Sequence, residues 1–424
     1  MRLVKTIAAP ELSPQGLSFP QSDEESALRA ALQAFSDRSV TETAREIDRL
    51  AADEVTEPSS KWWQLINSFA DLGLDIDALY FNSNQATGNR LKATAYEELG
   101  RGDAGFAIGL MVANFPYVMC RLLGRDDLAN MAHGKVGCWI ATQAERGSDV
   151  GDIEGTEIHP GSHHETGQMY AEIGDAHVWL YGRSSRWVSL GPLAQIALAY
   201  FPLRQNGKAL FNDDGTTKGV GVFVPLDAPG VDVGRPLDKL GQRSLPQGSL
   251  GFNAVTLPLS FIVAEPDEYR TNLLSALCEG NQTMGAVFAG VARRAYEYAL
   301  AYAHTRRQGG TTLIQHQLVR YRLFEAFRRL QTIRATVRQT FDFNARASEP
   351  HLLASVVSKV TATEGAIGIV EDCMRMFGGS GLTKEMPLEK LLRDARAAVT
   401  EDGDNHLLSL KSGSYLSWAY LSSK

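Results

Sequence analysis

The sequence lacks features that mark several classes of protein. Its four cysteines lie far apart and form no C-x-x-C pair, so we predict neither a zinc site nor a redox dithiol. Basic residues are not in surplus, because 42 lysines and arginines stand against 49 aspartates and glutamates. The net charge of -7 therefore argues against a protein that binds nucleic-acid phosphates.

Signals for membranes, export and metals are also missing from the sequence. No apolar run approaches the roughly 18 residues that a membrane-spanning helix needs, and the first residues do not resemble a signal peptide. We therefore expect a cytoplasmic protein without a membrane span. His159, His163 and His164 share one loop, but no carboxylate or cysteine stands at ligand spacing, so no metal site is predicted.

The composition is that of a folded globular protein, and the chain changes character twice. Hydrophobic residues make up 44% and charged residues 21% of its 424 residues, which is enough for a large core. We predict an α+β fold that is mainly α. It would comprise an N-terminal helical domain over residues 1–134, a middle β-barrel or β-sandwich domain over 135–264, and a C-terminal four-helix bundle over 265–424.

Hydrophobic periodicity supports this order. Apolar residues recur every three or four positions in five N-terminal segments: 24–35, 40–51, 61–72, 91–100 and 104–123. The period shortens towards two in six middle segments: 136–141, 169–173, 178–181, 195–201, 219–224 and 250–257. Long helical patterns return near residue 284, over 317–346, after Pro350 and after Gly403.

Separated motifs in a fixed order give the chain a resemblance to the acyl-CoA dehydrogenases and related flavoproteins. The segment Thr142-Gln-Ala-Glu-Arg-Gly-Ser-Asp149 resembles the family's Thr-Glu-Pro-x-x-Gly-Ser-Asp segment. The resemblance implies that Thr142 bonds the pyrimidine edge of FAD. It also implies that Gly147 and Ser148 approach FAD and the thioester arm of the substrate.

A second motif resembles the family segment beside the flavin ring. It reads Gly182-Arg-Ser-Ser-Arg-Trp-Val-Ser189. By resemblance, Trp187 covers one ring edge and Ser189 bonds near the flavin, and Trp139 also belongs to the cofactor site. A flavin needs an apolar wall and a few aimed donors, which these residue types provide.

Two C-terminal motifs resemble segments that hold FAD: in the family, the first reaches the FAD of a neighbouring subunit and the second approaches the phosphates of the cofactor. Arg306-Arg-Gln-Gly-Gly310 is followed by Leu313 and His316-Gln317, and Arg375-Met-Phe-Gly-Gly-Ser-Gly381 forms a glycine-rich turn. A guanidinium suits pyrophosphate because its donors form a fixed fork. The implied cofactor residues are Arg306, Gln308, Leu313, His316, Gln317, Arg375, Gly378 and Gly379.

The run Leu388-Glu-Lys-Leu-Leu-Arg-Asp-Ala-Arg396 matches the family closely and fixes the register of the catalytic position. In many members a glutamate stands there, immediately before a glycine, and removes the α proton of the thioester while the β hydrogen leaves as hydride. This chain has Asp402 there, followed by Gly403. Asp404 and His406 then fall at positions that contact the flavin.

Two other carboxylates stay open as the base, and Asp402 could instead cap the last helix. Glu401 would serve if the turn shifts by one residue. In a subgroup of the family the base comes from an earlier helix, at a place that corresponds to Gly280, so a slip of one residue would bring Glu279 there. Gly280, Glu279 and Asn281 are therefore the predicted substrate contacts, together with Ser148.

Three functions remain open on the sequence alone. The leading one is an FAD-dependent dehydrogenase of acyl-CoA or an acyl-carrier thioester, working as a homodimer or homotetramer with an electron-transfer flavoprotein or oxygen as acceptor. The second is an oxidase or monooxygenase similar to the nitroalkane oxidases, which carry aspartate at the corresponding position. Against it, Ser409 replaces the arginine that accompanies that aspartate. The third is a relative that binds FAD without catalysis.

Overall fold

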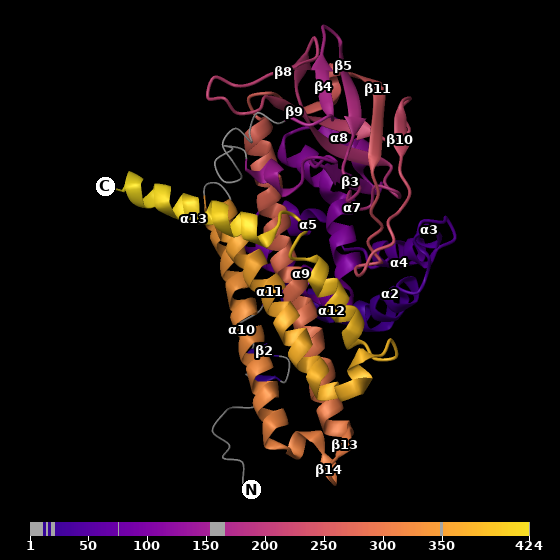
Figure 1. The fold of residues 1–424 in the computed structure, drawn as a ribbon, viewed down its shortest axis with the longest axis vertical. Coiled ribbons are helices and arrows are strands. Elements are labelled where there is room, and N and C mark those ends of the chain that lie inside the picture. Colours follow the sequence, from indigo (N-terminus) through magenta and orange to yellow (C-terminus); the bar gives the residue numbers. More distant parts are fainter. Residues whose placement is uncertain are drawn as a thin grey trace.

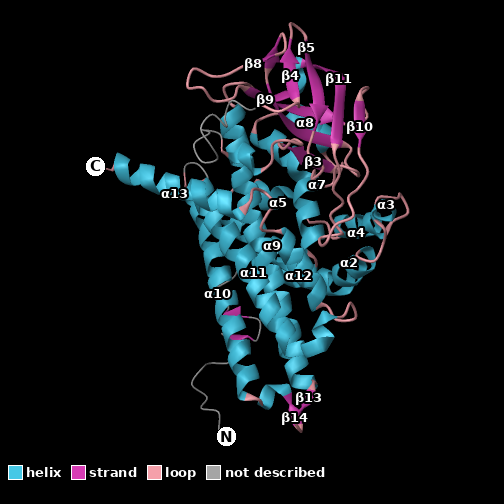
Figure 2. Ribbon diagram, in the orientation of Figure 1, coloured by secondary structure: helices cyan, strands magenta, loops and turns pink. Residues whose placement is uncertain are grey.

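The computed structural model describes residues 12–13, 16–17, 22–74, 76–152, 166–347 and 351–423. A long helical body carries a β module at one end (Figure 1), and the strands gather in that module, as Figure 2 shows. The α+β class, mainly α, is confirmed. The domain boundaries stay a prediction, although the described helices and strands follow the predicted order.

Short helices surround two long ones in the N-terminal part. The predicted helix at 61–72 forms as α4, and the one at 40–51 forms over 41–47 as α2, directly after a π-helical turn, η1 (Ser36–Val40). The sequence missed α3, α5 and α8, which have four to seven residues and therefore too few apolar repeats to reveal a period. The helices are α1 (Asp23–Phe35), α2 (Thr41–Ile47), α3 (Ala52–Val55), α4 (Lys61–Ala70), α5 (Ile76–Tyr80), α6 (Gln85–Gly102), α7 (Ala104–Leu122) and α8 (Asp126–Ala132).

The described part of the β module consists of a short hairpin, β7 (Arg204–Gln205) with β8 (Lys208–Ala209), and of two four-stranded sheets. One has the order β10-β11-β5-β4 and the other the order β12-β9-β6-β3, and only the β3–β6 pair among them is parallel. Strands β6 and β9 are buried on both faces, which explains their continuous apolar runs. The strands are β3 (Gly137–Ile140), β4 (Tyr170–Ile173), β5 (His177–Arg183), β6 (Ile196–Pro202), β9 (Gly219–Pro225), β10 (Val231–Val233), β11 (Leu250–Pro258) and β12 (Ile262–Ala264).

Long helices form the C-terminal part and run away from the β module (Figure 1). Helix α9 has 37 residues, and α10 and α11 pack along it. Helix α13 leaves the body at its side and exposes several large apolar side chains, Leu416 and Trp418 among them. The helices are α9 (Tyr269–Thr305), α10 (Gln317–Arg346), α11 (Leu352–Phe377), α12 (Leu388–Ala397) and α13 (Asn405–Ser422).

Among the described residues, two helices meet the length and composition of a membrane span. They are α7 and the stretch Leu352–Leu382, which continues α11. The sequence scan predicted no such run. The finding is weak support for a span, because most of α7 is buried against other elements, as in the core helix of a soluble protein. His159, His163 and His164 lie outside the described residues.

Helices α6 and α9 touch backbone to backbone at glycines. A Cβ atom at Gly290 would lie 2.1 Å from the Glu97 carbonyl oxygen, and one at Gly100 would lie 2.2 Å from that of Val287. Both distances are far below van der Waals contact, so a side chain at either position would push the helices apart. This close approach brings the buried charges of both helices together.

We expect Gly290→Ala to lower the free energy of unfolding by about 1–3 kcal/mol, because the added methyl group must displace α6. The measurement is chemical denaturation followed by circular dichroism. Gly413→Ala on α13 is the matched control, because nothing lies within 4 Å of its Cβ position. The control should be neutral or slightly stabilising. Equal stability of the two variants would contradict the close packing of α6 and α9.

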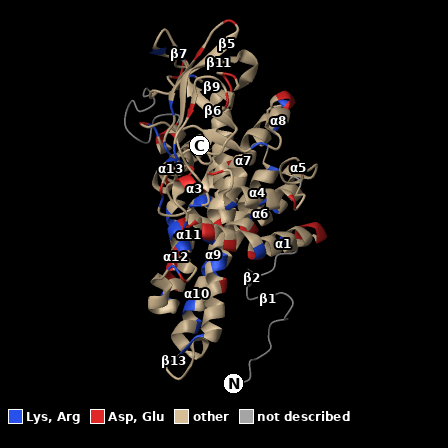
Figure 3. Cartoon of the chain, turned by 90° about the vertical axis from the view of Figure 1, so that its right-hand side faces the viewer, with Lys and Arg blue, Asp and Glu red and all other residues tan. Residues whose placement is uncertain are grey.

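A buried ionic cluster joins α1, α6, α9 and α10. The Arg293 guanidinium contacts Glu98 at 2.6 Å and Glu297 at 2.9 Å, and its side chain is 2% exposed. Glu98 also pairs with Arg29 at 2.7 Å, and Glu97 pairs with Arg334 at 3.0 Å. Acidic and basic residues alternate with each other along the helical body, as the colouring of the ribbon in Figure 3 shows.

Candidate active site

The centre of the candidate site is a turn of four residues between α12 and α13, Glu401 to Asp404, which we call the base turn. Four elements hold it, one at each residue. Gln242 Nε2 donates to Glu401 at 2.8 Å, and Asn281 Nδ2 donates to the Asp402 carbonyl at 3.1 Å. Lys359 Nζ donates to the Gly403 carbonyl, and the Asp404 amide donates to Ser148 Oγ at 2.8 Å.

The backbone of the base turn explains which of its two aspartates caps α13 and which does not. Asp402 has φ +49° and Gly403 has φ +95°, so the chain reverses through the left-handed region. Asp404, not Asp402, caps α13, because its carboxylate accepts from the His406 and Leu407 amides. The helix-capping role is therefore taken by Asp404, and the carboxylate of Asp402 points elsewhere.

The Asp402 carboxylate faces α9 at Gly280. One of its oxygens lies 3.4 Å from the position of a Cβ atom on Gly280. In the family the base stands at one of two positions, which correspond to residues 402 and 280 of this chain. These two residues lie next to each other in the structure, and of the two only Asp402 is an acid. Burial raises the pKa of Asp402, while the charge of Lys359 opposes that rise.

The other two carboxylates have partners of their own. Glu279 forms an ion pair with Lys92 at 2.8 Å and accepts from Gln282 at 2.6 Å. These contacts hold it on the side of α9 that faces α6, so the slip of register that would bring Glu279 to the site does not occur. Glu401 accepts from Gln242, and burial raises the pKa of Glu401 to about 7.

The predicted Thr142–Asp149 segment lies beside the base turn. Ser148 makes the contact, through its bond with Asp404. Thr142 and Ser185 hydroxyls lie 2.7 Å apart, which fixes the start of the segment. Gly147 donates its amide to Asp149 at 2.6 Å. The structure thus brings together the segment and the base turn, which are more than 250 positions apart in the chain.

Trp187 and Ser189 present an exposed ring and a hydrogen-bonded hydroxyl group to a ligand. The Trp187 side chain is 62% exposed, which is unusual for a tryptophan. Lys239 Nζ donates to Gln247 Oε1 at 2.7 Å, and Gln247 Nε2 donates to Ser189 Oγ at 3.0 Å. Because Ser189 accepts this bond, its own proton is available to a bound group. An exposed ring beside an oriented hydroxyl fits a flavin.

Trp139 is placed differently. It lies on β3 and packs against Phe115 and Tyr200, with ring centres 5.6 and 6.4 Å away. Its indole nitrogen is buried and has no hydrogen-bond partner in the described part of the protein. These contacts describe a packing residue, whereas Trp187 has the open face that a cofactor ring would need.

A second group of predicted cofactor residues lies at the far end of the bundle. Tyr302 stacks on Phe377 with ring centres 3.9 Å apart, which places the Arg306 motif beside the glycine-rich turn at Gly378. At about 1.5 Å per residue, Arg306 lies roughly 39 Å along α9 from Gly280. The two groups cannot hold one cofactor within a single chain. Apart from the buried Leu313 and the half-buried His316, the group is exposed: Arg306, Gln308, Gln317, Arg375, Gly378 and Gly379.

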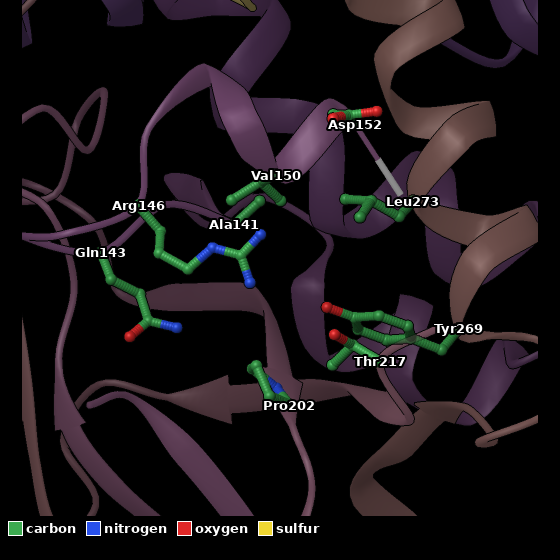
Figure 4. A pocket seen from close by; sticks show the side chains of 9 residues that line it. All are labelled: Ala141, Gln143, Arg146, Val150, Asp152, Pro202, Thr217, Tyr269 and Leu273. Carbon is green, nitrogen blue, oxygen red and sulfur yellow. The ribbon is translucent and has the colours of Figure 1, made fainter. Parts of the chain in front are cut away.

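A cavity lies between the β module and the start of α9 (Figure 4). The Arg146 side chain enters it from the Thr142–Asp149 segment, and Tyr269 and Leu273 enter it from α9. Residues 269, 273 and 280 share one face of the helix, so the cavity and Gly280 lie along the same stripe. The lining residues are Ala141, Gln143, Arg146, Val150, Asp152, Pro202, Thr217, Tyr269 and Leu273.

The sequence analysis missed Lys359 and Gln247. Lys359 falls within an apolar helical pattern, where a single lysine has no neighbour that reveals its role. Gln247 lies in a loop without periodicity. Gln242 also lies in a loop, and only the folded chain shows that it reaches Glu401.

A family model and known relatives both associate this chain with acyl-CoA dehydrogenases. Residues 271–410 match the family described as "Acyl-CoA dehydrogenase, C-terminal domain". The benzylmalonyl-CoA dehydrogenase of Aromatoleum aromaticum is 26% identical over 93% of this chain and 98% of its own length.

Solved structures share the whole fold. The butyryl-CoA dehydrogenase of Megasphaera elsdenii has a TM-score of 0.80 at 20% identity and covers 94% of this chain and 100% of its own. A glutaryl-CoA dehydrogenase of Mycobacterium smegmatis in complex with FADH2 has a TM-score of 0.77 at 21% identity, with coverage of 93% and 95%. At these identities the structures establish the fold.

Proposed function

Because this chain belongs to the acyl-CoA dehydrogenase family, we propose that it is an FAD-dependent oxidoreductase that introduces a double bond between the α and β carbons of an acyl thioester. Asp402 is the base that takes the α proton. The observation that carries this proposal is the half-buried Asp402 carboxylate, which is aimed at the bare backbone of Gly280.

The α proton of a thioester is very weakly acidic, so the base needs a dry and well-fixed position. Burial supplies the first condition and raises the pKa of Asp402. The hydrogen bonds of the base turn supply the second. Gly280 contributes space, because any side chain there would occupy the region in front of the carboxylate.

FAD fits beside the base turn. Trp187 offers an exposed ring, and Ser189 offers a hydroxyl proton that Gln247 has oriented. When bound, FAD supplies the acceptor for the hydride that leaves the β carbon. The distal group around Arg306 would hold the FAD of a second copy, so the functional unit is a homo-oligomer whose cofactor sites each use two chains.

The cavity of Figure 4 is the proposed entrance for the thioester arm. Tyr269 and Leu273 line it on the face of α9 that leads to Gly280, roughly 10 Å further along the helix at about 1.5 Å per residue. Arg146 brings a guanidinium to the entrance that pairs with Asp149 at 2.7 Å, so a phosphate of CoA or of a carrier-bound pantetheine arm would share this guanidinium with that carboxylate.

One observation favours a second candidate, a flavin oxidase similar to the nitroalkane oxidases. The base position holds aspartate, and Asn405 follows two residues after Gly403 as in those enzymes. Ser409 weighs against it, because its hydroxyl donates to the Asn405 carbonyl at 2.7 Å and brings no charge to the site. The nitronate anion formed when a nitroalkane loses its α proton would lack the cation that an arginine at position 409 supplies.

The test is anaerobic addition of an acyl-CoA panel to the FAD-loaded protein. The dehydrogenase reaction should bleach the flavin absorbance with at least one thioester, and an electron-transfer flavoprotein should then restore it. Rapid oxygen consumption with a small nitroalkane would favour the oxidase instead. No bleaching by any substrate, with FAD bound, would leave a non-catalytic flavoprotein.

A further inference from the structure

Lys359 is a fully buried lysine directly behind the base turn. It lies on α11 with no solvent exposure, and its ammonium donates to the Gly403 carbonyl. A buried ammonium is costly unless acids or hydrogen bonds compensate it. Burial lowers the pKa of Lys359 to about 8, and the acids that oppose this shift are Asp402, Glu401 and Asp404 of the turn and Glu364 of α11.

Other lysines near the turn act on carboxylates other than Asp402. Lys92 pairs with Glu279 across α9, and Lys411 of α13 pairs with Asp152. Lys239 of the β module acts on Glu401. Among the described residues, Lys359 is the cation whose charge acts on Asp402.

We propose that Lys359 is a positioning residue for the base: it anchors the backbone after Asp402 and places a positive charge behind the carboxylate. This inference rests on the proposed function, in which Asp402 removes the α proton. The anchor matters because Asp402 lies in the left-handed region, which is uncommon for residues other than glycine, so contacts to the turn help to keep this conformation.

The charge has a measurable consequence with a definite sign. Asp402 must be ionised to act, so flavin reduction speeds up as the pH rises through the pKa of Asp402. Burial raises that pKa and Lys359 lowers it. Removing the charge should therefore move the acid limb of the rate profile to higher pH. A shift of about one pH unit corresponds to an approximately tenfold slower reaction on the acid side.

The experiment measures anaerobic flavin reduction by a reactive acyl-CoA against pH in stopped flow, on the full FAD-loaded protein. Lys359→Gln keeps a donor for Gly403 but loses the charge, and it should shift the acid limb upward by about one unit. Lys359→Met loses both and should shift it at least as far. Lys359→Arg keeps the charge and should restore the wild-type limb.

Lys411→Met is the matched control, because it also removes a buried lysine but one that pairs with Asp152. Its acid limb should stay at the wild-type pH. If Lys359→Gln and Lys359→Met bind a normal amount of FAD and the acid limb of their rate profiles stays at the wild-type pH, the inference is wrong. Loss of FAD or of the fold in both variants would also overturn it, since Lys359 would then serve stability alone. Full reduction by Asp402→Asn would refute the proposed function separately.

Discussion

Replacing Asp402 by asparagine should slow flavin reduction by acyl-CoA about 10²–10⁴-fold, the contribution expected of a general base. Asparagine has the same shape and tolerates a positive φ, so the base turn should keep its conformation. FAD content and the visible spectrum of the oxidised flavin should therefore match the wild type. The measurement is single-turnover stopped flow without oxygen.

Glu401→Gln and Glu279→Gln are the matched controls, because each removes one nearby carboxylate. Both should retain most of the reduction rate, since Glu401 is bonded to Gln242 and Glu279 is paired with Lys92. Loss of reduction in Glu279→Gln alone would move the base to α9. Wild-type reduction by Asp402→Asn would remove the base from position 402.

Arg293→Met should lower the free energy of unfolding by about 3–5 kcal/mol, the cost of breaking a buried ion pair from one side. The variant leaves Glu98 at 0% exposure with Arg29 as its remaining partner. Methionine fills much of the lost volume, so the effect reports charge more than cavity. Urea denaturation at neutral pH, read by fluorescence and circular dichroism, measures it.

Arg328→Met tests the same substitution on an exposed pair with Glu325, and it should leave the free energy of unfolding almost unchanged. The pH dependence gives a further check. Burial alone would raise the pKa of Glu97, but the surrounding arginines, Arg334 first among them, hold it well below its usual range. That stabilisation is present above about pH 4 and declines in acid, so the deficit of Arg293→Met should shrink there. An equal loss in both variants would contradict the buried cluster.

Long periodic segments made much of the fold predictable. The helix predicted over 317–346 forms over the same residues as α10, and all six predicted strands form within two residues of their bounds. Short elements were missed because α3, α8 and β10 contain three to seven residues, too few to show a period. The π-helical turn of η1 was likewise invisible, since no residue type encodes it.

The sequence limited the base to a few acids but could not choose among them. Asp402, Glu401 and Glu279 differ by what their side chains meet, and those partners come from α6, α9, α11 and the β module. Tertiary contacts such as Lys92 with Glu279 leave no trace in spacing. Resemblance supplied the position of Asp402, and the assignment of the base stays a proposal.

The positive φ of Asp402 lowers the stability of the fold, whereas the proposed reaction needs the carboxylate of this residue. A left-handed backbone costs an L-amino acid roughly 1–2 kcal/mol, and glycine is exempt from that cost. Directed evolution that rewards heat resistance alone should thus enrich glycine at position 402 and deliver sturdier, inert enzymes. Libraries built from this scaffold need a turnover screen at every round to keep the aspartate.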